Sequence, residues 1–277
     1  MAEYQVGPTR FEEYSEKYKD FFKMKRKDGI IEVRLHTNDG PYVHNWPAHT
    51  AWNHAWSDIG RDPENEVLII TGTGDKWVVG DPSVWNVKFM DWPKQKKLEQ
   101  YHESLRLLEN FIFSIDIPTI GAVNGPGTHC ELCTLCDITL CTEDADFFDP
   151  HFLAGTTCGD GMALTLQQMM GLKRTAYYAY TGAHIHGKEA VELGIANECL
   201  PLENLVPRAW ELAERIMLAP KSTRHFTHSV LSRPWKKALV EDQGFHLAHQ
   251  MFDMAMDEEG SLERLKRMRA RLMGEEK

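Results

Sequence analysis

The chain lacks the features of membrane-spanning, secreted and disulfide-stapled proteins. No stretch approaches the roughly 18 consecutive apolar residues that a membrane-spanning helix needs. The first twenty residues contain no apolar segment of the signal-peptide kind. With 277 residues, of which 42% are hydrophobic, the chain is long enough to bury a core without disulfides or metals. We therefore expect a cytoplasmic globular protein whose six cysteines remain thiols.

Positive charge is also scarce. The chain has 31 Lys and Arg residues against 41 Asp and Glu residues, a formal net charge of −10. Such an acidic surface repels a phosphate backbone, and the only dense basic stretch is LERLKRMRARLM at residues 262–273. Nucleic acid is thus not an expected partner, and the basic stretch is most simply an amphipathic helix.

Strand and helix patterns alternate along the first half of the chain. Residues 30–36 (IIEVRLH), 66–72 (EVLIITG) and 118–125 (PTIGAVNG) predict strands, and helical patterns begin at Pro47 and Leu98 between them. This βαβ order predicts a parallel sheet and an α/β fold. After about residue 160 helical periods dominate, so we expect a core at residues 1–200 and a helical C-terminal region at 201–277 of the same domain.

Three segments could carry chemistry, and the first is TGTGDKWVVGD at residues 71–81. Its three glycines would let backbone N–H groups approach an anion or a carbonyl oxygen. The alternative is a tight turn, because the segment has neither the Gly-Lys-Ser/Thr end of a P-loop nor the spacing of a dinucleotide fingerprint.

The second segment, VNGPGTHCELCTLCD at residues 123–137, places Cys130, Cys133 and Cys136 at the spacing of an iron–sulfur ligand run. The leucines among them favour a buried helix in which the thiols act as small apolar residues. His129 lies at the predicted start of that helix, from which it could face a pocket or could be structural.

The third segment, FDPHFLAGTTCGDG at residues 148–161, carries His151 and Asp160. A carboxylate that accepts a hydrogen bond from one imidazole nitrogen fixes the tautomer, which leaves the other nitrogen to take a proton from water. A structural hydrogen bond between the two is the alternative. No histidine pair has zinc-site spacing with an acidic or cysteine partner in register, so we expect no metal.

In this order the three segments, followed by TGAHIHGKEAVELGIANECL from Thr181, resemble the crotonase (enoyl-CoA hydratase/isomerase) superfamily. The resemblance covers roughly residues 25–255. It implies a spiral of ββα units with a helical C-terminal trimerisation region, and a homotrimer or a hexamer built as a dimer of trimers.

The departures from the family pattern bear on function. Hydratases of this family hold one water with two glutamates; the first is retained as Glu131, whereas His151 stands at the second position. The glycine turn that supplies one oxyanion donor is shortened and carries His129, and the other donor position falls on Asp81.

With these residues at the changed positions, the sequence resembles the β-diketone hydrolases of the superfamily. The resemblance implies that His151 and Asp160 form a water-activating dyad, that His129 polarises a carbonyl, and that His49 lies in the pocket. Two pocket positions differ, because His44 and Gln250 stand where those hydrolases have a tryptophan and a glutamate.

We therefore expect an enzyme that hydrolyses a C–C bond of a small, cyclic 1,3-diketone in a retro-Claisen reaction without a cofactor. Two alternatives are a hydratase or hydrolase of CoA thioesters and a non-catalytic scaffold with the same fold.

Overall fold

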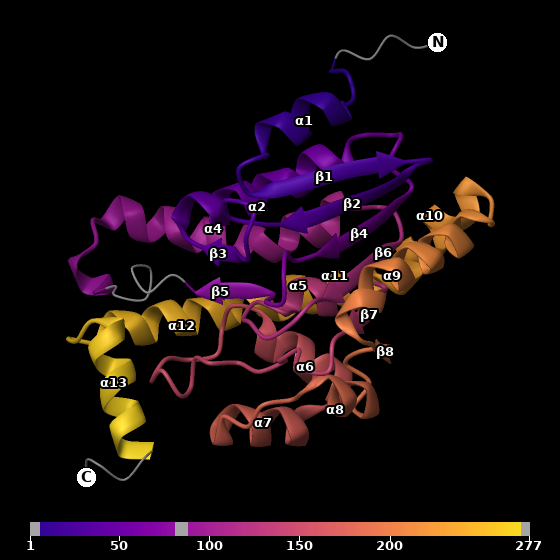
Figure 1. The fold of residues 1–277 in the computed structure, drawn as a ribbon. Helices are drawn as coiled ribbons and strands as arrows, with labels where there is room; N and C mark the ends of the chain where they lie inside the picture. The colour runs from indigo at the N-terminus through magenta and orange to yellow at the C-terminus, as the bar shows by residue number, and fades with distance from the viewer. Residues whose placement is uncertain (1–5, 81–87, 273–277) are drawn as a thin grey trace.

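A six-stranded sheet lies at the centre of the computed structural model, which describes residues 6–80 and 88–272 (Figure 1). The strand β1 runs antiparallel to its neighbour, and all the other neighbours are parallel. In spatial order the strands are β1 (Phe22–Lys27), β2 (Ile30–Leu35), β4 (Val67–Thr71), β6 (Thr119–Val123), β7 (Ile138–Cys141) and β8 (Glu198–Cys199). The predicted parallel sheet and the α/β fold class are confirmed.

The two helices predicted in the first half are also present. The helix α2 (Trp46–Gly60) begins where Asn45 accepts a hydrogen bond from the Ala48 backbone N–H at 3.0 Å, with Pro47 in its first turn. The helix α4 (Lys94–Ser114) begins four residues before the predicted Leu98 and packs against α2. Both connect successive parallel strands, as the βαβ order requires.

Helices cover both faces of the sheet, so its central strands are buried throughout. On one face Ile69 and Ile120 pack against Leu205 and Ala209 of α9 (Leu202–Met217). On the opposite face, residues of the same strands join the aromatic core of α2 and α4. Alternate side chains of one strand therefore enter different cores, which explains the continuous apolar runs in the sequence.

Smaller elements complete the fold. The strands β3 (Tyr42–His44) and β5 (Val78–Gly80) pair in parallel as a separate two-stranded sheet. The second half is mainly helical, as predicted. The remaining helices are α1 (Phe11–Lys17), η1 (Phe89–Asp91), α5 (Glu131–Thr134), α6 (Met162–Met170), α7 (Leu172–Thr181), α8 (Gly187–Glu192), α10 (Lys221–Leu231), α11 (Arg233–Ala238), η2 (Leu239–Gln243), α12 (Gly244–Met256) and α13 (Ser261–Leu272).

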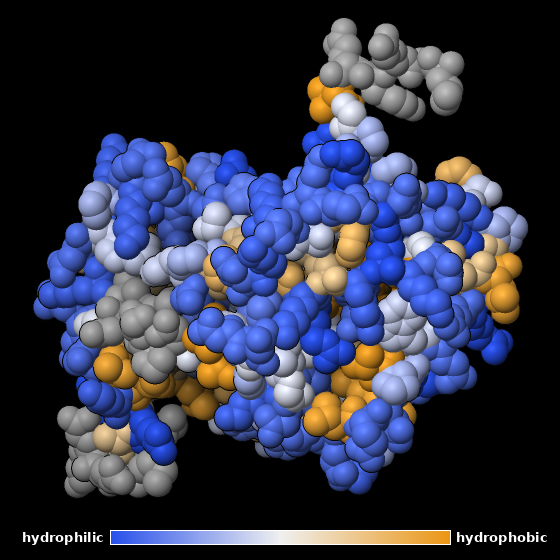
Figure 2. All heavy atoms as spheres, turned by 45° about the horizontal axis from the view of Figure 1, so that its top comes forward, coloured by the Kyte–Doolittle hydropathy of each residue, from blue (hydrophilic) through white to orange (hydrophobic). Residues whose placement is uncertain are grey.

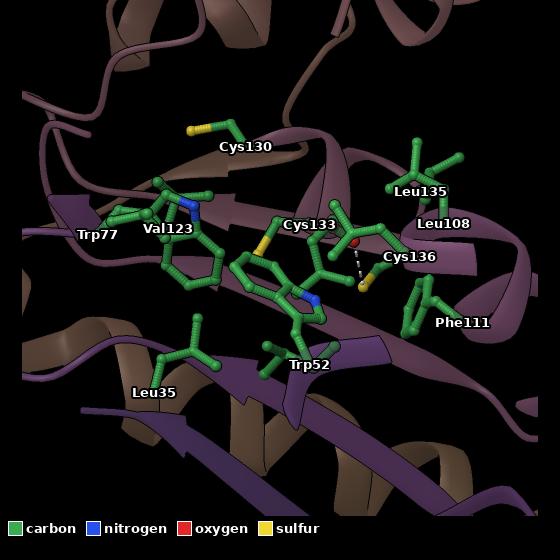
Figure 3. Packing of buried hydrophobic residues seen from close by; sticks show 14 of the residues in the cluster. Leu35, Trp52, Trp77, Leu108, Phe111, Val123, Cys130, Cys133, Leu135 and Cys136 are labelled. Carbon is green, nitrogen blue, oxygen red and sulfur yellow. Dashed lines mark hydrogen bonds between the residues drawn. The ribbon is translucent and has the colours of Figure 1, made fainter. Parts of the chain in front are cut away.

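The cysteine run is buried, but the helix predicted for it is only one turn long. α5 spans four residues, and Cys130 and Cys136 lie outside it. Figure 3 shows the three side chains among aromatic and aliphatic residues of the core. Cys130 donates to the Asp146 carbonyl and Cys136 to the Leu132 carbonyl, so each of these two thiols has a backbone acceptor.

Hydrophobic patches interrupt an otherwise hydrophilic surface (Figure 2). Large apolar side chains are exposed on the C-terminal helices α10 and α12 and on η2: Phe226, Val230, Leu231, Val240, Phe245, Phe252 and Met256. Among the described residues, no helix combines the length and the apolar character needed to cross a membrane.

Candidate active site

A cavity of about 170 Å³ lies between the loops that follow the parallel strands and the C-terminal helices α12 and α13. Its wall combines histidines and one carboxylic acid with many aromatic and aliphatic side chains. The lining residues are His44, Trp46, His49, Phe89, Trp92, Gln100, Ser104, Leu107, His129, His151, Ala154, Thr156, Asp160, Leu247, Gln250, Met251, Met254, Arg264 and Leu265.

The sheet topology explains why His129 and His151 meet. His129 follows β6 and His151 follows β7, and these two strands are parallel neighbours. The loops after parallel strands leave the sheet at the same edge, where open α/β sheets usually bind ligands. Residues 22 positions apart in the sequence therefore face one cavity.

A strained backbone holds His129 in place. Its φ of 59° lies in the left-handed region, which is costly for a residue other than glycine. Gly127 makes the turn before it possible, because an added Cβ would lie 2.5 Å from the Val78 backbone nitrogen. The indole N–H of Trp77 donates to the His129 carbonyl at 3.1 Å and fixes the turn from the other side.

Glu131 sets the charge of the His129 ring. Nδ1 of His129 lies 2.7 Å from Oε1 of Glu131, whose residue is 1% exposed. Burial opposes the charged ring, but the charge and the hydrogen bond of Glu131 outweigh burial and hold the pKa of His129 above its ordinary value. With Nδ1 engaged, Nε2 is the nitrogen that can donate toward the cavity.

His44 and His49 are neutral neighbours of this ring. The ring centroids of His44 and His129 are 4.5 Å apart, and those of His44 and His49 are 5.4 Å apart. Burial and the nearby His129 charge lower the pKa of His44 far below its ordinary value and that of His49 to about 4. At neutral pH both are uncharged, and each can donate one hydrogen bond and accept another.

His151 lies between two carboxyl groups. Nδ1 is 2.7 Å from Oδ1 of Asp149, and Nε2 is 3.3 Å from Oδ2 of Asp160. Burial opposes the imidazolium, but the charges of Asp160 and Asp149 raise the pKa of His151 to about 10. Burial also raises the pKa of Asp160, since it outweighs the attraction of His151. The His151–Asp160 pair therefore holds a proton tightly as a unit.

These three residues also form the one group among residues 6–80 and 88–272 whose ligand atoms could reach a metal ion, with all the atoms within 4.8 Å of one another. However, the two carboxylates contact different ring nitrogens. A hydrogen on each nitrogen can donate to the carboxylate that it faces, so both contacts suit a hydrogen-bonded imidazole.

Six of the predicted site residues line this cavity: His44, His49, His129, His151, Asp160 and Gln250. Glu131 does not line it and instead contacts His129 from behind. Asp81, predicted as an oxyanion donor position, lies outside the described residues.

Sequence reasoning missed Asp149 and the contribution of α13. Asp149 stands two residues before His151, and this short spacing in the sequence is the signal that could have identified it. Arg264 and Leu265 of α13 line the cavity, whereas the sequence of that stretch predicted only an amphipathic helix. Arg264 forms an ion pair with Asp257, so its charge is locally neutralised.

Comparison with known proteins agrees with this architecture. The family described as enoyl-CoA hydratase/isomerase matches residues 26–269. A crotonyl-CoA hydratase of Syntrophomonas wolfei is 30% identical over 161 residues, which cover 57% of this chain and 61% of the hydratase. The chain thus aligns with about three fifths of that relative's length.

Two solved structures share the fold. A β-diketone hydrolase from the cyanobacterium Anabaena, bound to (S)-3-oxocyclohexyl acetic acid, superposes with a TM-score of 0.82 at 33% identity, covering 88% of this chain and 97% of the hydrolase. An enoyl-CoA hydratase/isomerase from Mycobacterium paratuberculosis superposes with a TM-score of 0.80 at 24% identity, covering 90% of this chain and 98% of that protein.

Proposed function

The chain belongs to the enoyl-CoA hydratase/isomerase family, and within this family we propose that it hydrolyses a C–C bond of a small 1,3-diketone. The observation that carries the proposal is the placement of His151. It contacts Asp160 through Nε2 and shares a cavity with His129. By the resemblance to the family motif it also stands where hydratases have their second glutamate. This combines a proton acceptor with a separate cationic donor.

In the proposed reaction the Asp160 carboxylate, which contacts the protonated His151 and whose own pKa burial raises, takes a proton from water while the water oxygen bonds to one carbonyl carbon of the diketone. The bond from that carbon to the central carbon then breaks, and its electron pair forms an enolate on the second ketone. Proton return to the central carbon gives a ketone, and the attacked carbon becomes a carboxylic acid. The atoms of one water molecule are thereby consumed without a redox step.

The second ketone oxygen gains negative charge as the bond breaks, so a donor is most valuable there. His129 supplies it: Glu131 holds Nδ1 and favours the charged ring, which leaves an Nε2–H for the enolate oxygen. The neutral rings of His44 and His49 lie beside it and can orient the carbonyl groups. The apolar residues of the cavity lining suit the carbon skeleton of a cyclic substrate.

Hydration of an enoyl-CoA is the second candidate, since several relatives carry that name and Glu131 is retained. Two observations weigh against it. The Glu131 carboxylate contacts His129 instead of lining the cavity. Among the described lining residues, Arg264 is the one Lys or Arg, and Asp257 pairs with it, so the wall offers little to the phosphates of CoA.

The test is a substrate comparison in ¹⁸O-labelled water. We expect the purified protein to convert a cyclic 1,3-diketone into a keto acid that carries one ¹⁸O atom in its carboxylate, detected by mass spectrometry. Crotonyl-CoA and longer enoyl-CoAs should be unchanged under the same conditions. Hydration of an enoyl-CoA together with inert diketones would overturn the proposal.

A further inference from the structure

Asp149 lies on the opposite side of the His151 ring from Asp160. Its Oδ1 is 2.7 Å from Nδ1 of His151 and also accepts the His151 backbone N–H at 2.9 Å. The residue is 5% exposed, so water does not compete strongly for this oxygen. One carboxylate oxygen thus fixes both the backbone and the side chain of the same histidine.

We propose that Asp149 is the positioning residue of the site: it keeps the proton of His151 on Nδ1, so that Nε2 and Asp160 together carry the exchangeable proton. This inference rests on the proposed function and deepens it. It assigns the control of the tautomer to Asp149 and the exchange of protons with water to the Nε2–Asp160 side of the ring.

The hydrogen bonds of Asp149 support this division. An amide N–H can only donate, so Oδ1 of Asp149 must accept from the backbone, and a deprotonated Oδ1 can bond to Nδ1 only if Nδ1 carries a proton. Burial favours the neutral acid, but the charge of His151 and its hydrogen bonds hold the pKa of Asp149 below its ordinary value. Asp149 therefore stays ionised while the other side of the ring titrates.

The local backbone keeps this contact rigid. The Ala154 N–H donates to the Pro150 carbonyl at 3.0 Å, and the Thr156 N–H donates to the His151 carbonyl at 2.8 Å. The ring thus stands in a tight turn that begins directly after Asp149, its hydrogen-bond acceptor. A fixed ring orientation is what an acid–base group needs to meet a substrate at hydrogen-bond distance.

The titration of the ring depends on the ionisable groups around it and around its two partners. Besides the two aspartates, the groups with the largest influence are a buried carboxyl group, a second imidazole and a thiol: Glu131, His129 and Cys158. Removal of Asp149 takes away the one carboxylate on the Nδ1 side and leaves the Nε2 side unchanged.

The experiment compares Asp149→Asn with Asp253→Asn. Asp253 is the matched control, because its carboxylate holds the same loop through the Thr157 N–H and hydroxyl at 2.8 and 3.0 Å without contacting His151. In Asp149→Asn the amide can turn its NH₂ group toward Nδ1 and favour the wrong tautomer. We expect kcat to fall by about 10²–10⁴-fold with KM changed by no more than a few fold. Asp253→Asn should keep kcat.

A second measurement does not depend on turnover. ¹⁵N NMR of histidine-labelled protein, with the His151 signals identified from a His151→Gln spectrum, should show a protonated Nδ1 in the wild type across the pH range of folding. In Asp149→Asn the ¹⁵N chemical shifts of the His151 ring should change, because Nδ1 no longer faces a carboxylate. A wild-type ring with a bare Nδ1, or an Asp149→Asn variant with unchanged kcat and unchanged shifts, would overturn the assignment. If no diketone is hydrolysed, the proposed function fails, and the NMR result still decides the role of Asp149.

Discussion

Replacing Glu131 by glutamine tests whether the charge on His129 drives catalysis. Glutamine has nearly the same shape, and its carbonyl oxygen can still accept the Nδ1–H hydrogen bond that now measures 2.7 Å. The negative charge disappears, however, and with it the largest influence that raises the pKa of His129 against the effect of burial. The ring should then be neutral at pH 7, with its one proton on Nδ1 and a bare Nε2 toward the cavity.

The magnitude follows from the loss of one charged donor at the enolate. Removing a single oxyanion donor typically lowers kcat by about 10²–10³-fold, or about 3–4 kcal/mol of transition-state stabilisation. We expect a loss of this size with a smaller change in KM, because the oxygen carries more charge in the transition state than in the bound ketone. Steady-state kinetics with the best diketone substrate measure both constants.

Measuring kcat of both proteins as a function of pH gives a second test. Lowering the pH should protonate His129 again in Glu131→Gln, so the ratio of wild-type to variant kcat should shrink as the pH falls. The control is Glu198→Gln, the same chemical change at a carboxylate that pairs with Arg208 at 2.8 Å outside the cavity lining, and it should leave kcat unchanged. A kcat for Glu131→Gln within about threefold of the wild type would refute the role of a charged His129.

Three further outcomes are expected. The pKa of His151, raised to about 10 from an ordinary value of about 6.5, should stabilise the fold fully below pH 6.5. That contribution, on the order of a few kcal/mol, should be lost as the pH rises through 10; urea unfolding of the wild type should show the loss and His151→Gln should not. His44→Trp with Gln250→Glu should shift the preference among cyclic diketones and alter the pH profile; unchanged values would mean that these positions do not contact substrate. Sedimentation velocity should give a trimer or a dimer of trimers, and a monomer at micromolar concentration would contradict this.

The parallel sheet could be predicted because each of its central strands is a short apolar run between amphipathic helices. The helix beginning near Pro47 was predictable for a similar local reason, since proline in the first turn and the Asn45 cap are near neighbours in the sequence. The strand β1, with the sequence FKMKRK, gives a weaker signal, since it lies at the edge and is buried on one side only. The strands β3 and β5 have three residues each, too few for a period to be recognised.

The candidate site was only partly predictable. The sequence shows which residue types each segment carries, but the distances between their side chains depend on the folded backbone. The segments that carry His129 and His151 stood out by composition, and the parallel pairing of β6 and β7 brings them to one edge. Which carboxylate meets which ring nitrogen depends on a turn of a few residues. A spacing of nine residues from His151 to Asp160 and one of two residues from Asp149 are equally compatible with a hydrogen bond until the turn is known.

The position of Asp160 also depends on packing between distant parts of the chain. Gly159 precedes it, and an added Cβ there would lie 2.5 Å from the His246 carbonyl oxygen and 2.7 Å from Cβ of Gln250. The helix α12 therefore lies directly against the backbone that carries the carboxyl group of the proton-sharing pair. A larger or charged group at Gln250 acts on this backbone as well as on the cavity wall. We therefore expect changes at position 250 to alter substrate preference and the pH profile together.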